Sequence, residues 1–368
     1  MAEKIQLLAV NPGSTSTKIA VFIDQEKVFG KDIIHQAEKL DTFKEISDQF
    51  EYRRDMITEA LEAEGYKLED FTAFVGRGGG LNACAGGTYE INEQIINHAT
   101  TNSNHPATLG SIISDSFAKK YGKRSFIVNP PDVDEFEPVA RVTGIAEVIR
   151  ESRIHSLSHK EVGLRAAEQL GKKYEDCNFL IAHIGGGISV AAHKKGLMVD
   201  GTDLLTGDCP MAPTRSGFVP PGWIVKMCFS GKYNEKEMSQ LLRKNGGLVD
   251  HLGTSDVLEV KDRIAKGDKY AKLIYDAMIY QVAKTIGSYA PALCGEVDAV
   301  VLTGGISRDE NLVAELKKSI GFLGDVIVFP GEFEMEALAN GAYRVLTGVE
   351  TPLVYTGDPI WGGYEAYK

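Results

Sequence analysis

The sequence predicts a mixed α/β protein built from two related halves, and a repeated segment is the main reason. At Leu7–Phe22, two short apolar runs flank a turn that holds a proline, a glycine, four hydroxyl side chains and a lysine. Phe179–Ala192 repeats this plan of strand, glycine-bearing turn and strand, with Gly185 in the place of Gly13. Apolar runs this short, bounded by turn residues and without a helical period, are typical of buried strands.

The first of these turns has the chemistry of a phosphate site. Backbone N–H groups, hydroxyl donors such as Ser14 and the ammonium of Lys18 all suit a phosphate. An ordinary hairpin turn would explain the same residues, but the second copy favours the phosphate interpretation. A third element, Ala299–Ile306, ends a strand on Gly304 and Gly305, which would let a nucleotide come close to the backbone.

The composition narrows the class of protein. A chain of 368 residues is long enough for two domains with ample cores. The net charge of −11 argues against nucleic-acid and anionic-membrane partners, which need a basic surface. The five cysteines form no CxxC pair, as expected for reduced cytosolic thiols. No apolar run reaches the length of a membrane span, and the start runs straight into a strand without a signal peptide. We therefore expect a soluble, cytoplasmic protein.

Helices and strands should alternate through the rest of the first half. We expect a helix from Asp41 to Gly65, a strand over Phe71–Val75, a helix from Asn104 to Gly122 and a strand over Ser125–Val128. The strand ending at Val75 should deliver Arg77 into a run of glycines.

The second half should begin with loop-like acidic sequence and continue with helices around the central hairpin. Ser158 and Glu161 have the spacing of a capping box for a helix that runs to about Leu170. The segment Gly201–Gly222, which contains Arg215, is expected to be an active-site loop. The remaining expected elements are helices from Asn234, Asp256 and Lys269, the last reaching Cys294, a strand over Val297–Leu302, a helix after Ser307, and a final helix after Ile327–Glu334.

An ordered set of motifs resembles one enzyme family. The run Asn11–Lys18 resembles the opening signature of butyrate kinases, close relatives of acetate kinase. Further motifs follow in the family's order: Val75–Gly80, Ala182–Gly187, Arg215–Gly217, Gly246–Leu248, Gly253–Asp256 and Leu302–Gly305. Each is weak alone, but the ordered set spans nearly the whole chain. The resemblance implies the acetate kinase, sugar kinase, Hsp70 and actin superfamily, with two related actin/Hsp70-like (RNase H-like) domains flanking an active-site cleft.

Domain limits follow from the resemblance together with the proline pair Pro130 and Pro131. The first domain is expected over residues 1–128, completed by a C-terminal helix at about 333–368. The second, nucleotide-binding domain is expected over residues 129–332. Relatives of this kind assemble as homodimers or larger homo-oligomers, so we expect the same here.

The implied reaction is reversible phosphoryl transfer between ATP and butyrate, giving butyryl phosphate and ADP by direct in-line transfer with Mg²⁺. A carboxylate is already ionised near neutral pH and needs no general base. Catalysis must then come from positioning and from stabilising charge on the transferred group. Acetate, propionate and isobutyrate remain open as substrates, since one methylene is worth only about 0.8 kcal/mol on burial. An actin/Hsp70-like scaffold, or a sugar kinase using Asp132 or Asp134 as its base, is the alternative class.

The resemblance also implies the catalytic side chains. Arg77 and Arg215 match arginines that hold the carboxylate and the migrating phosphoryl group, although each would also suit an ordinary ion pair. His183 matches a histidine that donates to the phosphoryl oxygens, with a purely structural histidine as the alternative. His105 matches a second active-site histidine, with helix capping as the alternative, and His155 matches a family position to which no role is assigned here.

Nucleotide and metal contacts complete the expected site. The expected phosphate and nucleotide contacts are Asn11, Ser14, Lys18, Gly185, Gly186, Gly187, Gly304, Gly305 and Gly331. Glu334 matches the family's glutamate near the metal. The family tends to carry an aspartate after the strand ending at Val128, where this chain has Asn129, so Asn129 or Asp132 is the alternative metal contact.

Overall fold

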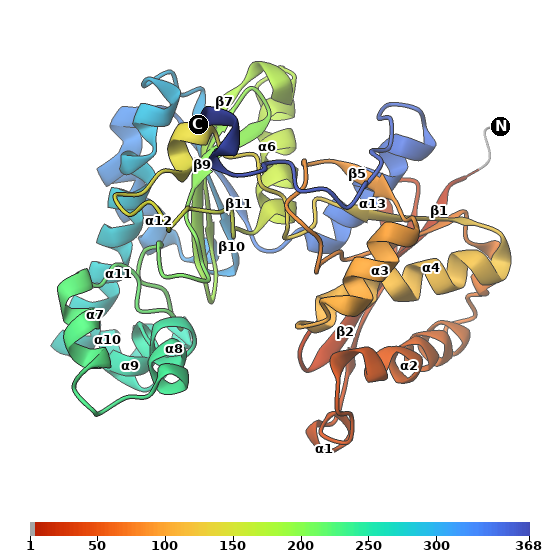
Figure 1. Cartoon of the computed structure of the whole chain (residues 1–368), viewed down its shortest axis with the longest axis horizontal. Coiled ribbons are helices and arrows are strands. Elements are labelled where there is room, and N and C mark those ends of the chain that lie inside the picture. The colour runs from red at the N-terminus through yellow and green to blue at the C-terminus, as the bar shows by residue number, and fades with distance from the viewer. Residues whose placement is uncertain (1–3) are drawn as a thin grey trace. The chain divides into compact units, whose positions relative to one another are not determined.

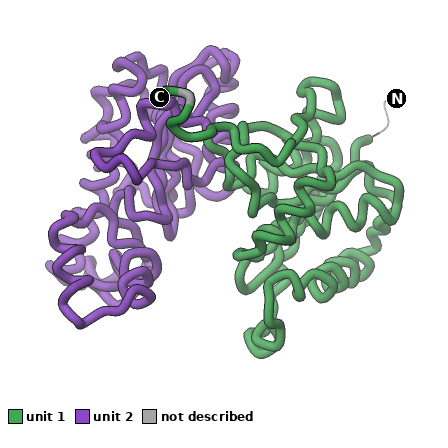
Figure 2. The backbone as a smooth tube through the Cα atoms, viewed as in Figure 1, with its two compact units in different colours: residues 1–134, 333–368 green, residues 135–332 purple. Residues whose placement is uncertain are grey.

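The computed structural model describes residues 4–368. The chain divides into two compact units, one of residues 1–134 with 333–368 and one of residues 135–332 (Figure 2). We call them unit 1 and unit 2. Each unit contains a single multi-stranded sheet among its described residues, so the predicted mixed α/β class is confirmed (Figure 1).

The sheet of unit 1 has the strand order β3-β2-β1-β4-β6-β5. Its strands are β1 (Gln6–Pro12), β2 (Ser16–Ile23), β3 (Glu26–Ile34), β4 (Ala73–Gly76), β5 (Thr88–Glu90) and β6 (Arg124–Val128). The first three are joined as antiparallel neighbours, whereas β1, β4 and β6 run parallel. The carboxyl ends of these three parallel strands therefore meet at one edge of the sheet.

The sheet of unit 2 repeats this topology. Its order is β11-β10-β7-β8-β9, with β7 (Asn178–Ile184), β8 (Ile188–Lys194), β9 (Leu197–Gly201), β10 (Ala299–Gly304) and β11 (Val326–Pro330). Again three antiparallel strands come first, and β7, β10 and β11 run parallel. The relation between the halves that the two hairpins predicted is thus a relation between whole sheets.

The helices of unit 1 pack on its sheet, and one of them lies very close to the carboxyl end of a strand. They are α1 (Ala37–Leu40), α2 (Phe50–Glu62), α3 (Glu93–Thr101), α4 (Leu109–Tyr121) and α13 (Glu334–Leu346). A methyl group on Gly76 would lie only 2.0 Å from the carbonyl oxygen of Gly110 on α4. Glycine at both positions lets α4 lie directly against the end of β4, which places the backbone of Arg77.

Two helices expected in unit 1 differ from the prediction at their starts. The helix expected from Asn104 to Gly122 begins later, at Leu109, after a 3-10 turn at Pro106–Thr108. Its end is confirmed, and Gly122 closes it in the left-handed conformation at φ 65°. The helix expected from Asp41 is wrong at its start, because a capping box between Glu45 and Asp48 begins a 3-10 turn there, and α2 starts only at Phe50.

The helices of unit 2 pack on its sheet and around the segment after β9. They are α5 (Pro138–Arg141), α6 (Ser156–Gln169), α7 (Pro221–Cys228), α8 (Glu235–Arg243), α9 (Leu248–Leu252), α10 (Val257–Ala265), α11 (Lys269–Ser288) and α12 (Glu310–Ile320). Asn234 and Asp256 cap helices as expected, whereas α11 ends at Ser288, before the expected Cys294.

The capping box expected at Ser158 and Glu161 is wrong. The helix begins at Ser156, so both side chains lie inside it, and both are buried. Ser158 makes its hydrogen bond with a histidine on β7, and Glu161 pairs with Arg165 one turn later. The local sequence pattern predicted that these two side chains cap the helix, but in the structure they bind other residues of unit 2.

Within residues 4–368, no helix combines the length and the apolar character needed to cross a membrane.

Candidate functional site

One carboxylate holds two candidate residues of unit 1 together. Asn11 lies near the end of β1, Arg77 follows β4, and Glu334 is the first residue of α13. Asn11 Nδ2 donates to Glu334 Oε2 and Arg77 Nη1 donates to Glu334 Oε1, each at 2.8 Å. The position of Glu334 in the first turn of a helix further stabilises its negative charge. The amide and the guanidinium are thereby fixed at the carboxyl ends of neighbouring parallel strands.

One N–H donor of the Arg77 guanidinium is not used within the described part of the chain. Its side chain is only 12% exposed, and its Nε is buried without a hydrogen-bond partner in the described part of the chain. An unsatisfied buried donor costs about 1–3 kcal/mol, and more on a charged group. A planar guanidinium with one edge on Glu334 and a spare N–H suits an anionic ligand.

Two polar side chains of the first hairpin share one face of the sheet. Lys18 on β2 lies directly opposite Asn11 on β1, so their side chains share a face of the sheet. The turn between them is closed by a hydrogen bond from Gly13 N to Ser16 O at 2.7 Å, and Ser14 is exposed at its tip. Asn11, Ser14 and Lys18 thus lie on one short hairpin beside Arg77.

A buried arginine that the sequence did not reveal lies behind this turn. Arg53 on α2 is fully buried, and its Nη1 donates to Ser16 O at 3.2 Å and Thr17 Oγ1 at 2.9 Å. Its Nε and Nη2 both donate to Gln49 Oε1, so these hydrogen bonds all end on neutral oxygens. Burial lowers the pKa of Arg53 to about 10, which leaves it cationic at neutral pH. The hairpin therefore has a positive charge directly beneath its turn.

His105 and Asn129 have structural partners. His105 caps the 3-10 turn at Pro106–Thr108, where its Nδ1 accepts a hydrogen bond from Ala107 N at 3.1 Å. Asn129 adopts a left-handed conformation at φ 39°, which asparagine tolerates well, and its Oδ1 accepts from Gly87 N at 2.7 Å. The side chains of both residues thus help to shape the backbone around them.

The residues present fit a magnesium ion that is shared with a nucleotide. No group of three or more His, Cys, Asp or Glu that could hold a metal occurs within residues 4–368. Mg²⁺ needs no such group, because it keeps several waters and binds through one or two carboxylates together with substrate phosphates. Glu334, with a side chain 25% exposed, can supply one carboxylate. Asp132, buried in the turn after β6, is the further carboxylate among the expected metal contacts.

In unit 2, His183 lies at the end of β7 and is held from two sides. Its Nδ1 is 2.9 Å from Ser158 Oγ, and its ring stacks on His155 with 4.1 Å between ring centres. A methyl group on Gly185 would lie 3.2 Å from His183 Nε2. The Nε2 edge of the ring therefore lies beside the glycine turn.

Buried polar groups continue from His155 into the core of unit 2. Ser189 Oγ is 2.7 Å from His155 Nδ1 and 2.9 Å from His159 Nε2, and His159 Nδ1 is 3.3 Å from His193 Nε2. Tyr174 is the last residue in this series of contacts, and its hydroxyl lies 2.5 Å from His193 Nδ1. Burial lowers the pKa of His159 to about 3 and that of His193 well below its usual value, so both rings are neutral. The signal in the sequence was the spacing of two histidines four residues apart, His155 directly before the helix and His159 in its first turn.

Arg215 is placed against the second glycine turn. Its Nε donates to Leu204 O at 3.1 Å, and a methyl group on Gly187 would lie 2.5 Å from its Nη1. The neighbouring Thr214 donates from both N and Oγ1 to Gly186 O, which ties the arginine segment to the turn. Burial lowers the pKa of Arg215, although the guanidinium stays charged.

A hollow of about 390 Å³ lies next to this turn. Its lining contains the predicted Gly186 and Gly305, together with Ser255, Asp256 and Ile306 from segments that the sequence also singled out. The further lining residues, which the sequence did not single out, are Pro213, Val257, Leu258, Lys261, Arg308 and Asp309. Gly304 and Gly331, at the ends of parallel β10 and β11, bond each other through their backbones at 3.1 Å. A hollow of this size, with glycine backbone and charged side chains, suits part of a nucleotide.

Comparisons with known proteins agree with this arrangement. Residues 140–328 match the model of the acetokinase family, which is more than half of the chain. The chain belongs to the acetokinase family.

Solved acetokinase structures share its fold over nearly the whole length. Acetate kinase from Porphyromonas gingivalis matches with a TM-score of 0.73 at 22% identity, covering 94% of this chain and 100% of that one. A propionate kinase from Francisella tularensis matches at 0.69 and 20% identity, covering 91% and 98%. Acetate kinase from Entamoeba histolytica matches at 0.72 and 18% identity, with the same coverage. The actin/Hsp70-like fold expected from the motifs is confirmed.

The contact between Gly187 and Arg215 leads to a first prediction. Gly187→Ala should lower turnover of the phosphoryl-transfer reaction by about 10-fold or more, because the new methyl group displaces the end of the arginine side chain. The thermal midpoint should change little, since the displaced group is flexible. Gly186→Ala is the matched variant for loss of turn flexibility, because its methyl group would meet no atom within 4 Å. Equal losses in both variants would contradict a specific effect on Arg215.

Proposed function

We propose that this acetokinase-family protein is a butyrate kinase, which transfers the γ-phosphoryl group of ATP reversibly to the carboxylate of butyrate. The observation that carries the proposal is Arg77, fixed by Glu334 and left with a buried spare donor beside the first hairpin. A guanidinium held this way suits the carboxylate of a small acid and the phosphoryl oxygens that approach it.

The proposed step is a direct in-line transfer. A carboxylate oxygen of butyrate attacks the γ-phosphorus, the bond to the β–γ bridging oxygen breaks, and ADP leaves. No residue has to remove a proton, since the acid is already ionised. Arg77, Arg215 and the Nε2 of His183 would stabilise negative charge on the transferred group. His105 would contribute at the same site, in addition to capping its turn.

The nucleotide is assigned to unit 2 and its phosphates to the glycine turns. Gly185, Gly186 and Gly187 would let backbone N–H groups approach the phosphates, and Gly304, Gly305 and Gly331 would border the adenosine. Asn11, Ser14 and Lys18 would contact the reacting phosphate from the first hairpin. Glu334, with Asn129 or Asp132, would hold the Mg²⁺, whose charge neutralises the phosphate oxygens when it is bound.

Butyrate is the first choice among short-chain acids because of the resemblance of Asn11–Lys18 to butyrate kinases. The structures compared above are of acetate and propionate kinases, so isobutyrate, propionate and acetate are the rival substrates. The proposal further places the enzyme in the cytoplasm as a homodimer or larger homo-oligomer.

Substrate choice is tested by the release of ADP from MgATP with acetate, propionate, butyrate, isobutyrate and valerate, with acyl phosphate trapped as hydroxamate. The proposal predicts product with several acids and the highest kcat/KM for butyrate. A maximum at acetate or propionate would overturn butyrate and keep the reaction class. Binding of ATP without turnover of any acid would favour a nucleotide-binding scaffold.

The two arginines give a sharper test of mechanism. Arg77→Ala and Arg215→Ala should each lower kcat by roughly 10³–10⁵-fold, the scale of an arginine that stabilises a transferred phosphoryl group. Arg124→Ala is a suitable control. Arg124 is the first residue of β6, at the opposite end of the strand from the candidate site, and the change removes only an exposed ion pair with Glu90. Near-normal turnover in either folded variant would remove that arginine from the mechanism.

A further inference from the structure

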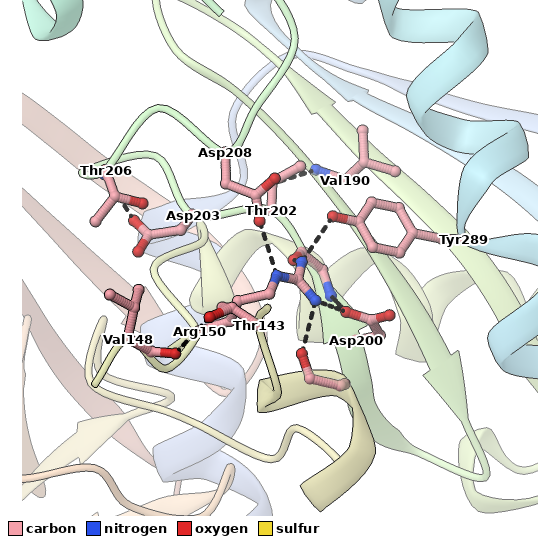
Figure 3. A network of polar contacts seen from close by, with 12 residues as sticks. Thr143, Val148, Arg150, Val190, Asp200, Thr202, Asp203, Thr206, Asp208 and Tyr289 are labelled. Atoms are coloured by element: carbon pink, nitrogen blue, oxygen red, sulfur yellow. Dashed lines mark hydrogen bonds and ion pairs between the residues drawn. The ribbon is translucent and has the colours of Figure 1, made fainter. Parts of the chain in front are cut away.

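Arg150 uses all of its donors inside unit 2. A guanidinium has five N–H donors, and each one of Arg150 has a partner (Figure 3). The acceptors are Asp208 Oδ2, Ala140 O, Asp200 Oδ1, Gly201 O and Tyr289 OH, at 2.6–3.3 Å. One side chain thus joins α5, the end of β9, the loop after it and the end of α11.

The electrostatics show that the two carboxylates dominate this cluster. Burial is the largest single influence and lowers the pKa of Arg150, but the hydrogen bond of Asp200 and the charges of Asp208 and Asp200 outweigh it and raise the pKa. The ion pairs are 2.8 Å to Asp200 and 2.9 Å to Asp208. Removing Arg150 would leave two partly buried carboxylates without their cation, whereas removing Asp208 would leave Arg150 paired with Asp200 alone.

The loop that Arg150 binds comprises residues 203–208, and a backbone hydrogen bond joins its two ends. Asp203 N donates to Asp208 O at 2.9 Å, so the two ends of the loop are joined by their backbones. Asp203 Oδ1 accepts from Thr206 N at 3.1 Å (Figure 3). It also accepts from Leu205 N at 2.7 Å, and the two bonds fix the turn within the loop. Because the loop is closed at its ends, a restraint on Asp208 also restrains the residues after Asp203.

Leu204 transmits this restraint to the candidate site. Its N–H donates to Arg153 O at 3.1 Å, and its carbonyl accepts the hydrogen bond from Arg215 Nε at 3.1 Å. Leu204 is 7% exposed and lies between the segment that begins with Arg150 and the arginine that contacts the glycine turn. A continuous set of contacts therefore joins Arg150 to Arg215 through Asp208, Asp203 and Leu204.

We propose that Arg150 is a positioning residue for Arg215. It anchors the 203–208 loop through Asp208, and the loop aims the Arg215 guanidinium through the Leu204 carbonyl. The inference rests on the proposed role of Arg215 in phosphoryl transfer. A misplacement of about 1 Å in a reacting group can cost about 10²-fold in rate, so a loosened loop should be measurable.

A double-mutant cycle separates positioning from general stabilisation. Arg150→Met and Asp208→Asn should each lower kcat by about 10²-fold, with a much smaller change in KM for MgATP. In an Arg215→Ala background, the same changes should add less than about 3-fold, because the group they position is gone. Arg150→Lys should recover only part of the loss, since a lysine cannot make the same set of bonds.

The control is Arg263→Met. Arg263 also pairs with a carboxylate, Asp268, and donates to a backbone oxygen, Leu252 O, in the same unit. It should leave kcat unchanged. A loss from Arg150→Met or Asp208→Asn that is equally large with and without Arg215 would overturn the inference, as would no loss in either variant. If Arg150→Met fails to fold, Asp208→Asn decides.

A second readout does not depend on turnover. The rate at which phenylglyoxal modifies Arg215, followed by peptide mass spectrometry, should rise several-fold in Arg150→Met and Asp208→Asn and stay at the wild-type value in Arg263→Met. An unchanged rate in the first two variants would contradict positioning. If the wild-type protein phosphorylates no acid, the proposed function is wrong, and the labelling still decides whether Arg150 positions Arg215.

Discussion

The carboxylate of Glu334 is the contact on which unit 1 depends. It joins Asn11 and Arg77, which precede it in the chain by 323 and 257 residues. A charged hydrogen bond to each partner is roughly twice as strong as a neutral one, and the pair on Arg77 is largely shielded from water. The bond requires α13 to return to the sheet made by the start of the chain, where it contacts β1, β4 and β6. The same carboxylate leaves the spare donor of Arg77 for a ligand.

In unit 2, the candidate side chains beside the glycine turn are held in place by uncharged partners. The repeated sheet topology again places a glycine turn at the end of a hairpin, but the groups around it are held by hydroxyls, backbone carbonyls and a stacked histidine. His183 is oriented by Ser158, and Arg215 by Leu204 O, neither of which carries charge. Neutral partners leave the full positive charge of Arg215 available to a phosphate, whereas a carboxylate would offset it. Two carboxylates of this unit, Asp200 and Asp208, pair with Arg150 and not with Arg215.

The strands and their glycine turns could be predicted from the sequence because their signals are local. Buried runs such as Phe179–Ile184 and turns such as Gly185–Gly187 are determined by their own residues. Predictions failed where a distant partner decided the outcome: Ser158 was expected at a helix end, but β7 supplies its partner. Arg53 and Arg150 carry no motif, because their partners lie up to 139 residues away, and only the fold brings them together. The local role of Asn129 also needed the structure, which shows its left-handed backbone and its hydrogen bond from Gly87 N.

The central claim is that a carboxylate oxygen attacks the γ-phosphorus of ATP. The most direct measurement incubates the protein with MgATP and butyrate whose carboxylate is labelled with oxygen-18, and follows the products by phosphorus NMR. Direct transfer to the acid yields ADP and butyryl phosphate whose phosphorus resonance carries the isotope shift of one bridging oxygen-18. Unlabelled inorganic phosphate alone would show transfer to water, and AMP with pyrophosphate would show attack at the α-phosphorus. Either result would contradict attack of the carboxylate on the γ-phosphorus.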